Sequence, residues 1–231
     1  MSGFDALVEG HYPLALRLHA PEGARRLLVL LHGVGGHEGN LTALASQAPA
    51  DTAVALVRGP LTIGPGQFAW FRVAFTAQGP SIVPEEAERS RRLLIHTLGQ
   101  LRAELQLGAE AVTIAGFSQG GILSASVALT DPSAATAFAI LSGRILPEIG
   151  PYIAPNDALR STRAFVGHGR FDQKLPVAWA ERSRELLERL DVAHEVNLYA
   201  TEHVLCPEMA NDFHRWHAQG VGASRAETLR D

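Results

Sequence analysis

The sequence predicts an α/β protein in which a mostly parallel central sheet is covered by helices on both faces. Short apolar runs alternate along the chain with longer amphipathic segments, a pattern typical of strands joined by helical crossovers. The 231 residues, 46% of them hydrophobic and 19% charged, suffice for one large core. We therefore expect one domain over residues 1–219 without a large cap domain, followed by a flexible tail at 220–231.

Seven short and mainly apolar runs are the expected strands. Each run is followed by turn residues or by a segment with helical periodicity. The runs are Leu14–Leu18, Leu27–Leu31, Ala53–Val57, Val112–Ala115, Ala137–Leu141, Ala164–Val166 and Glu195–Tyr199.

The clearest helix follows Pro84, where Glu85 and Glu86 suit the positive end of a helix dipole. Leucines then recur at steps of four and three residues, which places them on one core-facing stripe. These leucines are Leu94, Leu98, Leu101 and Leu105. A second helix is expected to begin at Pro176 and to end before Asp191.

Two irregular segments are expected to lie near a site. The longer one connects Val57 to Pro84, is rich in glycine, proline and aromatic residues, and is predicted to be a functional loop. Its aromatics could wall an acyl pocket or only seal the edge of the core. The other segment is Ser142–Thr162. The residues expected to line a substrate pocket are Phe68, Trp70, Phe71, Leu146 and Val204.

Composition argues against several classes of protein. The net charge is −4, the isoelectric point is about 6.2 and basic residues are spread along the chain, so we expect neither nucleic-acid binding nor an anionic membrane surface. No stretch is apolar for long enough to span a membrane. Met1–Gly10 lacks a signal-peptide pattern and Cys206 has no second cysteine to pair with, so we expect a cytoplasmic protein in which Cys206 is a half-buried small residue.

The run Gly116–Gly121, with the sequence Gly-Phe-Ser-Gln-Gly-Gly, joins the fourth expected strand to an alanine-containing helix. This context predicts a nucleophile elbow, a strained turn that pushes Ser118 out of the sheet and needs small neighbours. The N–H groups that begin the following helix favour the negative charge of acyl transfer. A glycine-rich loop whose serine only caps a helix is the alternative interpretation.

A nucleophilic serine needs a histidine as base and a carboxylate to orient that histidine. Asp172 follows the sixth expected strand and His203 follows the seventh, and the carboxyl ends of parallel strands meet at one edge of the sheet. We therefore expect Ser118, Asp172 and His203 to converge in the order typical of nucleophile-elbow enzymes. Asp157 and Asp191 lack this position after a strand.

The other histidines fit the role of base less well. His168 precedes Asp172 and is expected to shape its loop, while His194 falls at the start of a strand, the wrong end of the sheet. His214 and His217 share one face of the last helix, but no cysteine or carboxylate cluster with ligand spacing accompanies them, so no metal site is predicted.

A second glycine-rich turn follows the strand-like run Leu28–Leu31. It lacks the lysine and spacing of a phosphate-binding loop. We expect the backbone N–H groups of Val34 in this turn and of Gln119 after the serine to form an oxyanion hole. His32 is expected to be a structural residue there.

The chain resembles the phospholipase/carboxylesterase family of α/β-hydrolases, which includes acyl-protein thioesterases and small bacterial carboxylesterases. The resemblance extends over roughly Leu27 to Trp216. Its landmarks are Leu31–Gly36, Gly116–Gly121, Leu141-Ser142-Gly143 with Leu146-Pro147, His168–Asp172 with Pro176-Val177, and His203. It implies the same triad and oxyanion hole. Glu202 and Arg72 depart from the family pattern, where glycine often precedes the histidine and aspartate often follows Trp-Phe.

These observations predict a serine carboxylesterase that acts on small to medium acyl esters through an acyl-enzyme, without a metal or organic cofactor. Thioesterase, acyl-protein thioesterase or lysophospholipase activity at the same site remains an alternative. A catalytically silent ligand-binding hydrolase fold is another. The expected partner is a small-molecule ester, and a homodimer is left open.

Overall fold

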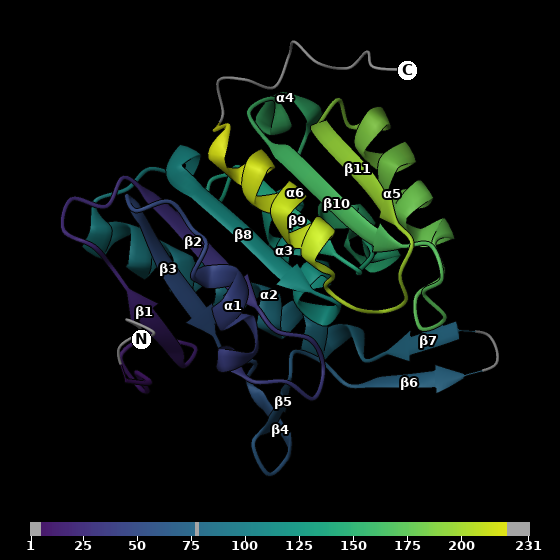
Figure 1. Ribbon diagram of the computed structural model, residues 1–231, viewed down its shortest axis with the longest axis horizontal. Coiled ribbons are helices and arrows are strands. Elements are labelled where there is room, and N and C mark those ends of the chain that lie inside the picture. The colour runs from purple at the N-terminus through teal and green to yellow at the C-terminus, as the bar shows by residue number, and fades with distance from the viewer. Residues whose placement is uncertain (1–5, 77–78, 221–231) are drawn as a thin grey trace.

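The computed structural model of the chain describes residues 6–76 and 79–220 (Figure 1). The tail expected at 220–231 falls, from residue 221 on, outside the described residues.

The core of the structure is a seven-stranded sheet with the order β1-β3-β2-β8-β9-β10-β11. Only β1 runs antiparallel to its neighbour β3, and the other neighbours in this sheet pair in parallel. The strands are β1 (Leu16–His19), β2 (Arg26–Leu31), β3 (Thr52–Val57), β8 (Val112–Phe117), β9 (Ala137–Leu141), β10 (Arg163–Gly169) and β11 (Ala193–Tyr199). The predicted mostly parallel sheet is confirmed, and all seven expected runs contribute to it, with the ends shifted in every strand except β9.

Helices cover both faces of this sheet (Figure 1). In β2, Leu27, Val29 and Leu31 pack into one apolar cluster, whereas Leu28 and Leu30 pack into the other. Burial on both faces is why these strands read as continuous apolar runs instead of alternating patterns. The helices α2 (Pro84–Leu105), α3 (Gln119–Thr130) and α5 (Ala178–Arg189) contribute to the first cluster, and α1 (Thr42–Ala45) and α6 (Pro207–Ala218) to the second.

The helix α2 begins at Pro84, as its sequence predicts. Of its leucine stripe, Leu94, Leu98 and Leu101 are completely buried, and Leu105 packs against them at the end of the helix. Gln106 ends α2 in a left-handed conformation (φ 56°). The second expected helix, α5, begins at Ala178, two residues after Pro176, because Pro176 and Val177 form the turn whose carbonyl groups accept the first N–H groups of the helix.

The expectation of a structureless loop between Val57 and Pro84 is wrong. This segment forms two antiparallel hairpins, β4 (Leu61–Gly64) with β5 (Gln67–Ala69), and β6 (Val73–Thr76) with β7 (Gly79–Ile82). Pairing within each hairpin satisfies backbone groups that a bare loop would leave to water. Both hairpins project from the edge of the sheet to which the strand arrows point (Figure 1).

Short helical turns complete the connections. The segment Ser142–Thr162 contains η3 (Pro147–Tyr152) and α4 (Asn156–Leu159), and the turns η1 (Glu38–Leu41) and η2 (Ala109–Ala111) precede α1 and β8. No helix within residues 6–76 and 79–220 is both long and apolar enough to cross a membrane.

Candidate active site

Ser118 occupies the turn between β8 and α3. Its backbone has φ 53° and ψ −115°, a strained conformation for a residue with a side chain. Its N–H donates to the carbonyl of Leu141 at 2.8 Å, which anchors the turn to β9. The side chain therefore leaves the sheet at the carboxyl edge, as expected for a nucleophile elbow.

Glycines next to Ser118 are required by the close packing of three elements. A methyl group on Gly120 would collide with the carbonyl group of Leu31 in β2, and one on Gly116 would collide with the backbone of Gly120. The elbow can therefore form only where β8, α3 and β2 approach without side chains between them.

Asp172 lies in the loop after β10 and is buried, with 4% of its surface exposed. Its Oδ1 accepts hydrogen bonds from the N–H groups of Lys174 (2.9 Å) and Leu175 (2.8 Å). Its Oδ2 lies 2.6 Å from Nδ1 of His203. The carboxylate is thus fixed by its own loop, and the imidazole nitrogen closest to it is that of His203, while Nε2 of His168 lies 3.5 Å from the same oxygen.

His203 lies in the loop after β11, between this carboxylate and the serine. Its Nε2 is 3.0 Å from the Oγ of Ser118. With Nδ1–H donating to Asp172, Nε2 is left to accept the proton of the serine hydroxyl. The ring of Phe117 lies 5.0 Å from the imidazole, centroid to centroid, and supports it from the side.

His168 shapes the loop of Asp172 from the end of β10. It is completely buried, and burial lowers the pKa of its imidazole, which therefore stays neutral at pH 7. Its Nε2 donates to the carbonyl of Leu175 at 2.7 Å. His168 therefore stabilises the loop that positions the carboxylate of Asp172, and it is not the base that faces Ser118.

Backbone hydrogen bonds continue the pairing of four neighbouring strands beyond their ends. Each bond links the residue after one strand to the next strand along the sheet: Ser118 N–H to Leu141 O (2.8 Å), Ser142 N–H to Gly167 O (2.8 Å) and Arg170 N–H to Tyr199 O (2.7 Å). Gly169 lies so close to the carbonyl groups of Thr201 and Glu202 that no side chain would fit there. We call this set of three bonds the strand-end ladder.

Val34 and Gln119 line the same hollow as Ser118 and His203. The neighbouring amides in the first turn are engaged, because Gly35 N–H donates to Phe68 O and Gly36 N–H to Gly33 O. Among the residues that the structure describes, the N–H groups of Val34 and Gln119 have no hydrogen-bond partner. Both donors are therefore available to a ligand beside Ser118.

His32 organises this glycine-rich turn. Burial lowers the pKa of His32 to about 4, so the imidazole is neutral at pH 7. Its Nδ1 donates to the carbonyl of Gly33 (2.7 Å), and its Nε2 accepts the N–H of Gly59 (2.9 Å). The indole N–H of Trp70 donates to the carbonyl of His32 at 2.8 Å. His32 has the structural position expected from the sequence.

The hollow beside Ser118 has a volume of about 30 Å³, room for about two water molecules. Of the five predicted pocket residues, only Phe71 lines it. The other four lie elsewhere: Phe68 packs under the guanidinium of Arg58, Trp70 is completely buried, Leu146 lines a separate cavity of about 250 Å³, and Val204 is 47% exposed.

Several lining residues were missed from the sequence. Val73, Pro80 and Ile82 come from the second hairpin, which was expected to be an irregular loop, and Arg144 and Lys174 come from the loops after β9 and β10. Their position after predicted strands was a usable signal for the last two.

The remaining candidates do not form a second site. His217 is buried with its Nδ1 3.1 Å from the hydroxyl of Thr113, and burial lowers its pKa to about 3. Within the part of the chain that the structure describes, no three side chains of the types that bind metals gather. Burial raises the pKa of Cys206, which is half-buried and remains a thiol at pH 7.

Comparison with known proteins shows which family the chain belongs to. The chain is 25% identical to acyl-protein thioesterase 1 of Kluyveromyces lactis over 178 residues, which is 72% of this chain and 78% of that protein. Its fold is similar to that of a Bacillus cereus carboxylesterase (TM-score 0.77, 22% identity, 88% of this chain and 93% of the other). A carboxylesterase from Mesorhizobium loti is similar as well (TM-score 0.78, 20% identity, 94% and 99%). Residues 19–217 match the Phospholipase/Carboxylesterase family model, and the chain therefore belongs to this family of ester hydrolases.

Proposed function

We propose that the protein is a serine carboxylesterase in which Ser118 is the nucleophile, His203 the general base and Asp172 the residue that orients the base. The observation that carries this proposal is the continuous chain of contacts from Ser118 Oγ through His203 (3.0 Å) to Asp172 (2.6 Å). The distances are those at which a proton can pass between heavy atoms.

In the first half of the reaction, His203 Nε2 takes the proton of Ser118 as Oγ bonds to the acyl carbon. The negative charge moves to the carbonyl oxygen, where the N–H groups of Val34 and Gln119 donate hydrogen bonds. His203 then gives its proton to the leaving alcohol, and the acyl group remains on Ser118. Water repeats these steps on the acyl-enzyme and releases the acid.

The side chain of Gln119 supports this geometry. Its Oε1 accepts the N–H of Trp70 (3.1 Å) and its Nε2 donates to the carbonyl of Phe71 (2.7 Å). The backbone N–H after the nucleophile therefore belongs to a residue whose side chain is fixed by two buried hydrogen bonds.

Thioester hydrolysis is the second candidate function, because the relative from Kluyveromyces lactis is named an acyl-protein thioesterase. The same serine and histidine would cleave a thioester, and only the leaving group would differ. The hollow of about 30 Å³ favours short acyl groups for either reaction. A purely ligand-binding role is less favoured, since the hydroxyl of Ser118 already meets an imidazole nitrogen.

The test is hydrolysis of p-nitrophenyl esters from acetate to long acyl chains, with Ser118→Ala and a matched thioester in parallel. We expect turnover of short esters that falls with chain length and disappears in Ser118→Ala, because Ser118 supplies the hydroxyl that faces the imidazole of His203. Equal activity of Ser118→Ala and the unaltered protein would overturn the proposal. Faster cleavage of the thioester would favour the second candidate.

A further inference from the structure

Two arginines are buried among the described residues: Arg144 is 6% exposed and Arg163 is 5% exposed. A guanidinium stays protonated at neutral pH, so burying one without partners is unfavourable. The surroundings of the two side chains differ in a way that separates a structural role from a ligand-binding one.

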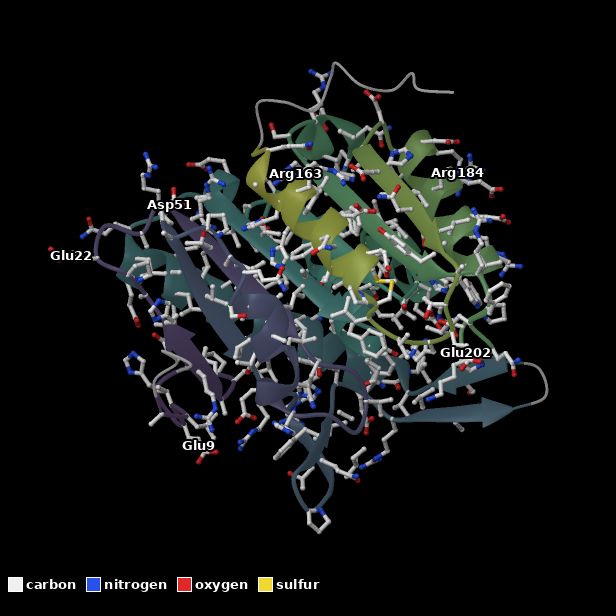
Figure 2. All side chains as sticks on the ribbon, in the orientation of Figure 1. Glu9, Glu22, Asp51, Arg163, Arg184 and Glu202 are labelled. Atoms are coloured by element: carbon white, nitrogen blue, oxygen red, sulfur yellow. The ribbon has the colours of Figure 1, made fainter. Side chains whose placement is uncertain are left out.

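Arg163 has partners that account for its burial. Its Nη1 donates to the carbonyl of Trp216 (2.9 Å), its Nη2 to that of His217 (3.4 Å), and its guanidinium lies 4.0 Å from the ring centre of Trp216. These carbonyls end α6, where a positive charge is favourable. Figure 2 shows Arg163 and Glu202 at opposite ends of the sheet, so this arginine is remote from the site.

Arg144 has no comparable partners. Its Nε is buried without a hydrogen bond, as is that of Arg163, but within the described residues no carboxylate or carbonyl group accepts a hydrogen bond from the terminal nitrogens of Arg144 either. The guanidinium lies 4.4 Å from the ring centre of Trp179, a contact that fixes its position but satisfies none of its N–H groups. Burial lowers the pKa of Arg144 as well.

This arginine lines the hollow that contains Ser118 and His203. Lys174, an exposed residue, lines it too, and the lining includes no aspartate or glutamate. Asp172 lies behind His203 and is engaged by three donors. The nearest acid that acts on Arg144, Glu148, is exposed and makes no ion pair with it.

We propose that Arg144 is a specificity residue that binds a carboxylate on the substrate, and that the substrates are short esters carrying this second, anionic group. The planar guanidinium matches a carboxylate with two parallel hydrogen bonds. Because Arg144 lines the same hollow as Ser118 and His203, a carboxylate bound to it would lie beside the scissile bond. This inference rests on the proposed esterase function, since it assigns the substrate class of the same site.

The first test compares two esters that differ only in this charge: monomethyl succinate and methyl levulinate, in which an acetyl group replaces the carboxylate. Acid release is followed in a pH-stat. We expect the unaltered protein to prefer monomethyl succinate. In Arg144→Gln the ratio of the two kcat/KM values should fall by about 10- to 100-fold, mainly through KM, because a charge-assisted bond is lost.

Two further variants separate binding from packing. Arg144→Lys keeps the charge without the planar fork and should restore part of the ratio. Arg182→Gln is the matched control, since the guanidinium of Arg182 lies 4.7 Å from the same Trp179 ring but does not line the hollow, and it should leave the ratio unchanged. An unchanged ratio in Arg144→Gln, or no preference in the unaltered protein, would overturn the inference.

A second test does not depend on turnover. Calorimetric titration of the Ser118→Ala protein with succinate should show binding that disappears in Ser118→Ala/Arg144→Gln. If succinate binds but the unaltered protein hydrolyses no ester, the anion site is supported and the esterase proposal is overturned. Ester turnover that requires Ser118 but does not change in Arg144→Gln would support the esterase proposal and overturn the anion site.

Discussion

At the scale of single residues, the two carboxylate oxygens of Asp172 have different roles, one structural and one in the proposed chemistry. One carboxylate oxygen accepts two backbone N–H groups of its own loop, and the other faces His203. An asparagine could keep the first set of bonds through its carbonyl oxygen. It would then turn its NH2 group, which can only donate, toward the imidazole.

We therefore predict that Asp172→Asn lowers kcat for a short p-nitrophenyl ester by about 10⁴-fold while the protein remains folded. The loss follows because His203 no longer has a negative partner to fix its tautomer and stabilise its charged form. Steady-state kinetics and thermal unfolding measure the two effects. Asp157→Asn, an exposed aspartate in α4, is the control. An Asp172→Asn protein with more than a tenth of the original kcat would contradict the assigned role.

The residues of the candidate site differ in how far the sequence could reveal them. Ser118, Asp172 and His203 could be found because each follows a strand, and strand ends converge in a parallel sheet. Arg144 could not be assigned a role in this way. The role proposed for it depends on its burial and on an Nε that lacks a hydrogen bond, which only the packed structure shows.

At the scale of elements, the packing of α3 against the sheet depends on Gly120. We predict that Gly120→Ala lowers the melting temperature by 10 °C or more, or prevents folding, since about 3 kcal/mol or more of overpacking would correspond to such a shift in a domain of this size. The added methyl would meet the backbone carbonyl of Leu31, which cannot rotate away. Calorimetry measures the shift, and an unchanged melting temperature would contradict the packing described for the elbow.

Gly99→Ala is the matched substitution with the opposite expected sign. Gly99 lies inside α2, and a methyl group there would meet nothing within 4 Å. Alanine is favoured over glycine in a helix by about 1 kcal/mol, so the melting temperature should rise by about 2–4 °C. A decrease would show that α2 is strained at this position.

Elements were predicted best where burial imposes a regular pattern. The leucine stripe of α2 and the apolar runs of the sheet fall into this class. The hairpins between Val57 and Pro84 were not predicted. Strands as short as β5 (Gln67–Ala69) contain too few residues to show an alternation of polar and apolar side chains, and the glycines and prolines of the segment suggest a loop. Part of the pocket was missed for the same reason, since the lining residue Val73 belongs to β6 and the lining residues Pro80 and Ile82 belong to β7.

At the scale of the whole molecule, buried titratable groups make the fold sensitive to acid. Burial lowers the pKa of His32 to about 4 and that of His217 to about 3, against an ordinary value of 6.5. Below pH 6.5 the unfolded chain therefore binds protons that the folded one excludes, and stability falls as the pH decreases.

A buried carboxylate extends this sensitivity to lower pH. Burial alone would raise the pKa of Glu38, but hydrogen bonds from Arg58 and Arg17 outweigh it and lower the pKa to about 2 from 4.5. Its contribution is complete above pH 4.5 and is lost as the pH falls toward 2. Acid should thus weaken the fold in two successive stages, through the histidines first.

We predict that the free energy of unfolding in urea falls by at least about 2 kcal/mol per pH unit between pH 6 and 5, because His32 and His217 bind protons there only in the unfolded chain, and burial also lowers the pKa of His168 and His214. His217→Gln, remote from the hollow, should reduce this slope by about 1 kcal/mol per pH unit. A free energy that is constant over this range would contradict the neutral, buried state of both histidines.

The overall architecture was predictable because one physical constraint governs it. A parallel sheet needs crossovers, crossovers place helices on both faces, and strands buried on both faces read as apolar runs. The antiparallel direction of β1 was not predictable from its composition, since a strand at the edge of the sheet can pair in either direction without changing which residues are apolar.

The strand-end ladder has a consequence for how the protein would lose activity. The serine, the carboxylate and the histidine follow β8, β10 and β11, and hydrogen bonds join the ends of these strands to one another through β9. None of the three can be displaced far without breaking a bond that also holds a strand. The loss of activity and the unfolding of the sheet should consequently have the same temperature dependence. The activity that remains after heating is then proportional to the fraction of molecules that are still folded.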